Sequence, residues 1–327
     1  MRGTVTLNLI TRSSLAKRSW RSWTSTSVPA RQVQHLQRPP RRPSPRLERA
    51  YVVIDRGSFR TRDGTPLAVY DWPVEGAALT AIIVHGLGEH AGRYELLAHW
   101  LNSKGVAVRA YDQFGHGNSE GPRGGLLRES QLPEHLGELA TATMEHPSFA
   151  GRPLVLIGHS LGGLVVASAI CRGLVAPQLA VLSSPALAVR MAAWQRAAVK
   201  ILPRLAPALT LGNGLDPNML SHDPQVVAHY IADPLVHDRI CARLGAFVAT
   251  EGERVRSSAP RWRTPTCVLY AGDDRAVDPS GSREFVSAAP SNIVRAQCFP
   301  AMYHEIFNEP DRAIALSVLE TALADVA

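Results

Sequence analysis

Residues 154–163 have the sequence Leu-Val-Leu-Ile-Gly-His-Ser-Leu-Gly-Gly, in which four apolar, β-favouring residues lead directly into Gly-x-Ser-x-Gly. An apolar segment at 164–170, suited to a buried helix, follows. This order of strand, tight turn and helix is the setting in which a serine becomes an exposed nucleophile. Gly158 and Gly162 fit the turn because a side chain at either position would collide with neighbouring backbone. The stretch therefore predicts Ser160 as a nucleophile in strained backbone angles, the alternative being a glycine-rich turn without chemistry.

Strand-like and helix-like segments alternate on both sides of this run. The sequence predicts strands at 51–59, 67–72, 81–84, 106–111, 154–157, 179–182, 266–271 and 294–299, and helices at 94–103, 126–145, 161–171, 282–288 and 312–324. The first two strands are expected to form an antiparallel hairpin that turns at Asp63-Gly64. The remaining alternation predicts an α/β fold, a mostly parallel sheet flanked by helices on both faces.

The alternation stops between about residues 186 and 261. Helices are expected at 187–205, 225–231 and 238–250, with a turn at 212–214. An insertion at this place in such a sheet lies over the carboxyl ends of the strands, where ligands bind, so it is interpreted as a helical lid. Ordinary core helices are the alternative. The apolar positions of its first helix suit either lipid contact or packing on the core: Met191, Trp194, Val199, Ile201 and Leu202.

A serine nucleophile needs a histidine base and a carboxylate that orients the base, in the chain order serine, acid, histidine. The strand at 266–271 is followed by acidic residues, of which Asp274 is the preferred candidate and Asp273 and Asp278 are rivals. A solvated turn is the other explanation of these acids. The strand at 294–299 is followed by His304, the only histidine in the required position, 30 residues beyond Asp274. Its neighbours Tyr303 and Glu305 receive no role.

The negative charge that develops on an acyl carbonyl oxygen requires preorganised N–H donors. One donor is expected to be the backbone N–H of Leu161, directly after the nucleophile. The other is assigned to the N–H of Leu87, in the His85–His90 loop that follows the strand at 81–84. A plain glycine turn is the alternative for this loop.

The basic character of the chain belongs to its first 50 residues. The 327-residue chain has a net charge of +7, but residues 1–50 hold 11 basic residues and one acidic residue, and the remaining 24 basic and 27 acidic residues sum to −3. The globular part therefore gives no reason to expect nucleic-acid binding. Residues 1–50 are interpreted as a disordered basic extension, and residues 51–327 as the folded domain. A mitochondrial-type transit peptide and sequence upstream of the true start codon are the alternatives.

No apolar run is long enough for a transmembrane helix. Four widely spaced cysteines form neither a zinc-binding pair nor a C-x-x-C motif: Cys171, Cys241, Cys267 and Cys298. We expect reduced thiols, no metal or cofactor, and a cytoplasmic location, with peripheral membrane contact left open.

Five motifs in order make the chain resemble the α/β-hydrolase superfamily, and more narrowly its monoacylglycerol lipase and lysophospholipase-like branch, called serine aminopeptidase S33-type. The motifs are His85–His90 with Gly92-Arg93-Tyr94, Asp112–Gly121, Gly158–Gly163, Gly272–Arg275 and Tyr303–Glu305, and the resemblance covers residues 52–326. It implies a Ser160, Asp274 and His304 triad and a mobile lid that admits acyl chains. Related epoxide hydrolases and dehalogenases use an aspartate nucleophile where this chain has Ser160.

The leading hypothesis is a metal-free serine hydrolase that cleaves monoacylglycerol-like or lysophospholipid-like esters through an acyl-enzyme. Its partners would be a small acyl ester and, transiently through the lid, a membrane surface. An S33-type aminopeptidase is the first alternative, in which Asp216, Asp223 or Asp233 of the lid would hold the substrate ammonium group. A non-catalytic binding protein on the same fold is the second.

Overall fold

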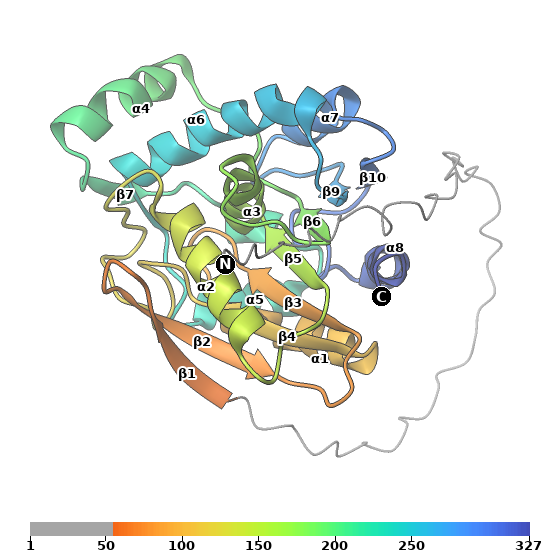
Figure 1. Cartoon of the computed structure of the whole chain (residues 1–327). Helices are drawn as coiled ribbons and strands as arrows, with labels where there is room; N and C mark the ends of the chain where they lie inside the picture. Colours follow the sequence, from red (N-terminus) through yellow and green to blue (C-terminus); the bar gives the residue numbers. More distant parts are fainter. Residues whose placement is uncertain (1–54) are drawn as a thin grey trace, which may run out of the picture. The chain divides into compact units, whose positions relative to one another are not determined.

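The computed structural model describes residues 55–327, so the expectations for residues 1–50 and for a strand beginning at residue 51 lie outside the described residues. The main sheet has the strand order β1-β2-β4-β3-β5-β6-β9-β10 (Figure 1). Its strands are β1 (Asp55–Arg60), β2 (Pro66–Trp72), β3 (Leu79–Val84), β4 (Val106–Tyr111), β5 (Leu154–His159), β6 (Leu179–Ser183), β9 (Thr266–Ala271) and β10 (Val294–Phe299). From β4 to β10 all neighbouring strands are parallel, whereas β1 and β2 form an antiparallel hairpin. The prediction of a mostly parallel sheet is confirmed.

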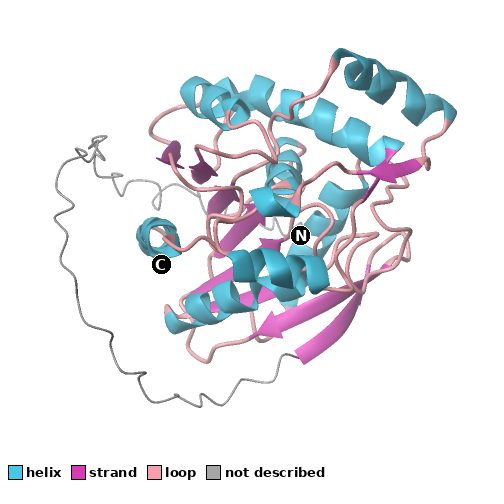
Figure 2. Ribbon diagram, turned by 180° about the vertical axis from the view of Figure 1, so that it is seen from behind, coloured by secondary structure: helices cyan, strands magenta, loops and turns pink. Residues whose placement is uncertain are grey.

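Helices cover both faces of this sheet, as the two opposite views show (Figures 1 and 2). They are η1 (Ala91–Tyr94), α1 (Glu95–Ser103), α2 (Gln131–Glu145), α3 (Leu161–Cys171), α7 (Ser280–Ala288) and α8 (Arg312–Ala324). Side chains of β3 alternate between two cores: Ile82 and Val84 pack with α2 and α3, whereas Ala81 and Ile83 pack with α1 and α8. A strand buried on both faces favours apolar side chains at nearly every position, which explains its mainly apolar sequence. The one polar residue, Thr80, donates its hydroxyl to the Phe149 carbonyl (2.8 Å).

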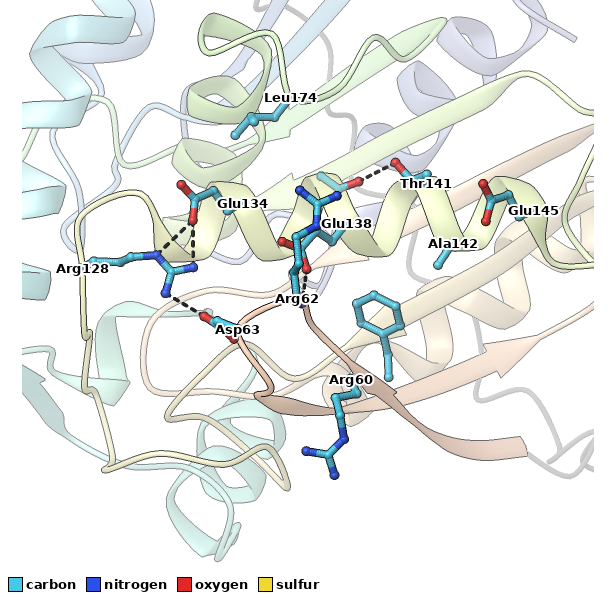
Figure 3. Close-up of a pocket in the computed structure, with 12 residues that line it drawn as sticks. Arg60, Arg62, Asp63, Arg128, Glu134, Glu138, Thr141, Ala142, Glu145 and Leu174 are labelled. Atoms are coloured by element: carbon cyan, nitrogen blue, oxygen red, sulfur yellow. Dashed lines mark hydrogen bonds and ion pairs between the residues drawn. The ribbon is translucent and has the colours of Figure 1, made fainter.

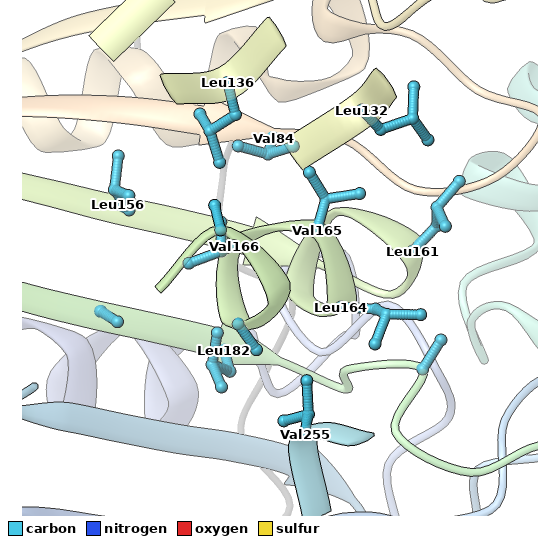
Figure 4. Close-up of a cluster of buried hydrophobic side chains, with 14 of the residues drawn as sticks. Val84, Leu132, Leu136, Leu156, Leu161, Leu164, Val165, Val166, Leu182 and Val255 are labelled. Atoms are coloured by element: carbon cyan, nitrogen blue, oxygen red, sulfur yellow. The ribbon is translucent and has the colours of Figure 1, made fainter. Parts of the chain in front are cut away.

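Helix α3 lies at the centre of the larger core (Figure 4). Leu164, Val165 and Val166 are fully buried against strand residues, α2 and Val255. A helix that is apolar on all sides is stable only when it is enclosed in this way. The nucleophile turn is therefore held between a central strand and a fully enclosed helix.

The insertion between β6 and β9 contains two short strands as well as helices. Its elements are α4 (Ala193–Leu205), β7 (Thr210–Gly212), η2 (Pro217–Met219), α5 (Pro224–Ala232), β8 (Arg239–Cys241), α6 (Ala242–Ser258) and η3 (Ala259–Arg261). The helices expected from residues 187 and 238 begin later, at Ala193 and Ala242. The Ala188 carbonyl is engaged by the N–H of Asp278, and residues 239–241 pair with β7 as an antiparallel strand. Tertiary contacts thus override helix propensity at both places.

Helix α4 packs on α6 at the outer end of the insertion (Figure 1). Among residues 55–327, none of the helices combines the length and the apolar character needed to cross a bilayer.

Candidate active site

Ser160 lies in the sharp turn between β5 and α3 with φ 54° and ψ −119°, a strained conformation for a residue other than glycine. Hydrogen bonds hold both of its backbone groups, since its N–H donates to the Ser183 carbonyl (2.9 Å) and its carbonyl accepts from the N–H of Ala186 (3.0 Å). A Cβ on Gly158 would overlap the Gly162 carbonyl, and a Cβ on Gly162 would overlap the Val84 carbonyl. Both glycines are therefore required for the turn to approach the sheet.

Asp274 and His304 form a buried pair at the carboxyl ends of β9 and β10. Nδ1 of His304 lies 2.8 Å from Oδ2 of Asp274. The other oxygen of Asp274 accepts from the N–H groups of Ala276 (2.9 Å) and Val277 (3.0 Å). Because the carboxylate engages Nδ1, the ring is oriented with Nε2 as the nitrogen that can accept a proton.

The two members of this pair stabilise each other's charged forms. Burial alone would raise the pKa of Asp274, but the charge and hydrogen bond of His304 and the two backbone N–H groups hold it below the usual 3.8. Burial likewise lowers the pKa of His304, but the adjacent carboxylate outweighs it and raises this pKa above the usual 6.5. The site thus favours the imidazolium that a general base becomes after it takes a proton.

The rival acids are engaged elsewhere. Asp273 pairs with Arg275 at 3.2 Å on the surface, and Asp278 accepts from the N–H of Ser280 at 3.0 Å, in the first turn of α7. The structure therefore brings Asp274, and neither rival, to His304.

His159 lies directly before the nucleophile and packs on the base. Its ring centroid is 4.6 Å from that of His304, and its Nδ1 is 3.1 Å from the Ser183 hydroxyl. Burial, together with the neighbouring His304, lowers the pKa of His159 to about 4. His159 is therefore neutral at neutral pH and borders the base without competing for its proton.

The loop after β3 lies against the nucleophile. A Cβ built on Gly86 would come within 3.1 Å of Cβ of Ser160, so this loop passes directly beside the serine. Leu161 is the first residue of α3 and its N–H is not used within the helix, since the first amides of a helix have no carbonyl partner there. Leu87 follows Gly86 in the loop. The two residues expected to supply oxyanion donors thus lie in the two segments that border the serine.

An ionic cluster behind this loop was missed from the sequence. Arg93 contacts Glu89 at 2.5 Å and reaches both carboxylate oxygens of Glu305 at 2.8 and 2.9 Å. Oε1 of Glu89 accepts from the N–H of Gly86 (2.6 Å) and from the Tyr94 hydroxyl (2.7 Å). Glu89 and Arg93 lie in a motif that marked the family resemblance, but no local pattern joins Arg93 to a residue 212 positions away.

Part of the insertion is bonded to the same loops. The Leu220 carbonyl accepts from the N–H of Glu305, and the N–H of His237 donates to the Gly88 carbonyl, both at 2.8 Å. Asp233 lies 2.8 Å from Nε2 of His90.

The three acidic residues of the insertion that were considered as ligands of a substrate ammonium group therefore all have other partners. Asp233 binds His90, whereas Asp216 and Asp223 cap the first turns of η2 and α5. Within residues 55–327, no cluster of three or more His, Cys, Asp or Glu side chains could hold a metal ion.

A separate open groove of about 830 Å³ lies between the β1–β2 hairpin and α2 (Figure 3). It is lined mainly by charged side chains, and Arg128 bridges Asp63 and Glu134 within it. Neither Ser160 nor its proposed partners line this groove. The groove is thus separate from the candidate active site, and Asp63, Arg128 and Glu134 within it are already bound to one another.

The parallel sheet, the strained serine between β5 and α3, and the acid–histidine pair on later strands together define an α/β-hydrolase. Residues 77–311 match the family described as serine aminopeptidase, S33. The chain is 34% identical over 239 residues to the monoacylglycerol lipase of Mycolicibacterium smegmatis. The aligned residues cover 72% of this chain and 84% of that protein. It belongs to this family, in the monoacylglycerol lipase-like branch, and is a hydrolase of the serine esterase type.

Solved structures agree with this placement. The crystal structure of Paleococcus ferrophilus monoacylglycerol lipase superimposes with a TM-score of 0.69 at 35% identity, covering 84% of this chain and 99% of that chain. A soluble variant of monoglyceride lipase from Saccharomyces cerevisiae, in complex with a substrate analog, gives a TM-score of 0.74 at 21% identity over 85% of this chain and 96% of that chain. The second likeness supports the fold alone.

Proposed function

We propose that this enzyme cleaves monoacylglycerol-like or lysophospholipid-like carboxylic esters through an acyl-enzyme formed on Ser160. Its Oγ attacks the acyl carbonyl carbon while His304 takes the hydroxyl proton, and Asp274 orients the resulting imidazolium. The N–H groups of Leu87 and Leu161 stabilise the oxyanion of the tetrahedral intermediate. Collapse of this intermediate expels the alcohol, which receives its proton from His304. Water, activated by His304, then releases the fatty acid and restores Ser160.

The observation that carries this proposal is the buried 2.8 Å contact between Asp274 and His304, on strand ends next to the strained Ser160 turn. The monoacylglycerol lipases similar to this chain support an ester substrate with one acyl chain. The aminopeptidase alternative is less well supported, since the three carboxylates considered for the substrate ammonium group, Asp216, Asp223 and Asp233, are engaged elsewhere.

The test compares Ser160→Ala with Ser287→Ala, whose hydroxyl only contacts a carbonyl on the exposed side of α7. We expect Ser160→Ala to lose about 10⁴-fold or more of kcat on monoacylglycerol and on p-nitrophenyl esters, because the nucleophile is gone. Ser287→Ala should match wild type. Retained hydrolysis in Ser160→Ala, or faster turnover of aminoacyl amides than of esters by wild type, would overturn the proposal.

The same proposal includes transient contact of the insertion with a lipid surface. On α4, Trp194, Ile201 and Leu205 are 69%, 53% and 77% exposed. Basic side chains of the same helix are also exposed: Arg196, Lys200 and Arg204. A helix with exposed aromatic and aliphatic side chains and a basic polar face suits the interface of a bilayer.

We place the enzyme in the cytoplasm, which agrees with four cysteines that are all unpaired.

A further inference from the structure

Three charged side chains are buried together behind the candidate base. Glu89, Arg93 and Glu305 have side chains that are only 4%, 11% and 5% exposed. Arg93 makes a two-pronged contact with Glu305 and a single contact with Glu89. Burying a charged side chain costs several kcal/mol unless strong partners replace its contacts with water. The burial of these three charged side chains beside the candidate base therefore calls for an explanation.

The Glu89–Arg93–Glu305 cluster does not neutralise itself. Two carboxylates face one guanidinium, which leaves a net charge of −1. The further contacts are uncharged: the Tyr94 hydroxyl donates to Glu89, the Asn308 amide donates to Glu305, and the Tyr230 ring lies 4.7 Å from the guanidinium carbon of Arg93. The cluster therefore places a fixed negative charge in a region of low dielectric, where its effect on neighbours is strong.

This charge lies next to the reacting groups. Glu305 follows His304 directly, and Glu89 binds the N–H of Gly86 in the loop beside Ser160. Around His304, the titratable groups are Asp274 after β9, His159 at the end of β5, Glu305 in its own loop and Glu89 after β3. Burial lowers the pKa of His304 and Asp274 raises it most, and Glu305 and Glu89 raise it further.

We infer that Glu305, held by Arg93, is a positioning residue that stabilises the protonated form of His304. Because Arg93 also binds Glu89, Glu305 ties the loop that carries His304 to the His85–His90 loop. This inference rests on the proposed function. Glu305 does not touch the reacting atoms in this scheme. Its carboxylate acts through the imidazolium that forms when His304 takes the serine proton.

The test is the pH profile of kcat/KM for Glu305→Gln, which keeps the size of the side chain and can still bond Arg93 but removes the charge. The neutral base is the active form, so activity falls as pH drops through the pKa of His304. With less negative charge nearby, this acidic limb should move to lower pH by about half to one unit. Glu305→Asp keeps the charge and should return the limb towards its wild-type position.

Glu251→Gln is the matched control, because Glu251 is also a buried carboxylate bonded to an arginine, Arg172, but belongs to α6. It should leave the limb unchanged. Two results contradict the inference: an acidic limb in Glu305→Gln at the wild-type pH, or an equal loss of activity at all pH values without a shift.

A direct titration of His304 by NMR separates this inference from the proposed function. The His304 ring signals, assigned with His304→Gln, should titrate at lower pH in Glu305→Gln than in wild type. This shift is expected even if the protein hydrolyses none of the esters tested. An unchanged titration overturns the inference while leaving the proposed function intact.

Discussion

At the scale of single residues, the site depends on groups that are costly to hold in place. Ser160 occupies backbone angles that cost about 1–3 kcal/mol, and His304 is buried although its pKa is raised above the usual 6.5. Each cost is offset by identified neighbours. Hydrogen bonds to Ser183 and Ala186 fix the serine backbone, and Asp274 compensates for the burial of His304. These neighbours are therefore where substitutions should act most specifically.

Asp274→Asn is the sharpest substitution of this kind. An amide in place of the carboxylate fits the space but favours the wrong ring tautomer, so kcat should fall by about 10³- to 10⁴-fold. Asp273→Asn is the matched control, since Asp273 contacts only the exposed Arg275, and it should retain wild-type kcat. Equal losses in the two variants would contradict the assignment of the acid.

The pH dependence of the wild-type enzyme follows from the same pair. Since the pKa of His304 is raised above 6.5, kcat/KM should decline on the acid side with a midpoint above that value. The measurement is kcat/KM on a soluble ester between pH 5 and about 9, together with circular dichroism to show that the fold persists. A midpoint below 6.5 would contradict a carboxylate-supported base.

At the scale of elements, the main sheet and its helices could be predicted because their signals are local. The mainly apolar strands, the Asp63-Gly64 turn and the glycines around Ser160 each specify a nearby structure. The helix predictions for residues 187–192 and 238–241 were wrong because the backbones of these segments are engaged by distant partners. The Arg93–Glu305 contact could not be predicted for the same reason, since it joins two loops that are far apart in the sequence. The candidate catalytic residues could be predicted because each follows a recognisable strand.

The nucleophile turn makes a prediction about stability. Gly162→Ala would drive a Cβ into the Val84 carbonyl, so the free energy of unfolding should fall by about 3 kcal/mol or more. Gly245→Ala is the control, because Gly245 lies within helix α6 and a Cβ there would come no closer than 3.9 Å to Cδ1 of Ile240. That change should raise the unfolding free energy by about 0.4–1 kcal/mol. Urea unfolding of both variants tests the contrast, and a mild effect at Gly162 would contradict the close approach.

Helix α4 makes a prediction about interfacial activity. Replacing Trp194 and Ile201 by serine removes apolar surface that would enter the lipid, so vesicle binding should weaken by about tenfold or more. Ile314→Ser is the control, since Ile314 is 56% exposed but belongs to α8, whose buried side chains pack with α1 in the other core. Hydrolysis of a short soluble ester should not change in either variant. Equal vesicle binding by all three proteins would contradict a lipid-facing role for α4.

At the scale of the whole molecule, charge and chemistry are separated along the chain. All candidate site residues lie between residues 85 and 305, in the part whose sequence has a net charge of −3, whereas residues 1–50 have a net charge of +10. A basic segment of low hydrophobicity is drawn to anionic lipid through electrostatics that salt screens, whereas insertion of an apolar helix face is less sensitive to salt. The basic extension and α4 should therefore contribute differently to surface binding.

Deletion of residues 1–50 tests this separation. The shortened chain should keep the thermal midpoint and the kcat of the full chain on a soluble ester, because residues 1–50 lack the apolar content of a packed core. Its binding to anionic vesicles should weaken strongly at low salt, whereas its binding to neutral vesicles should stay the same, since α4 is retained. A lower thermal midpoint would show that the extension is part of the fold. Unchanged binding to anionic vesicles would assign the whole interaction to residues 51–327.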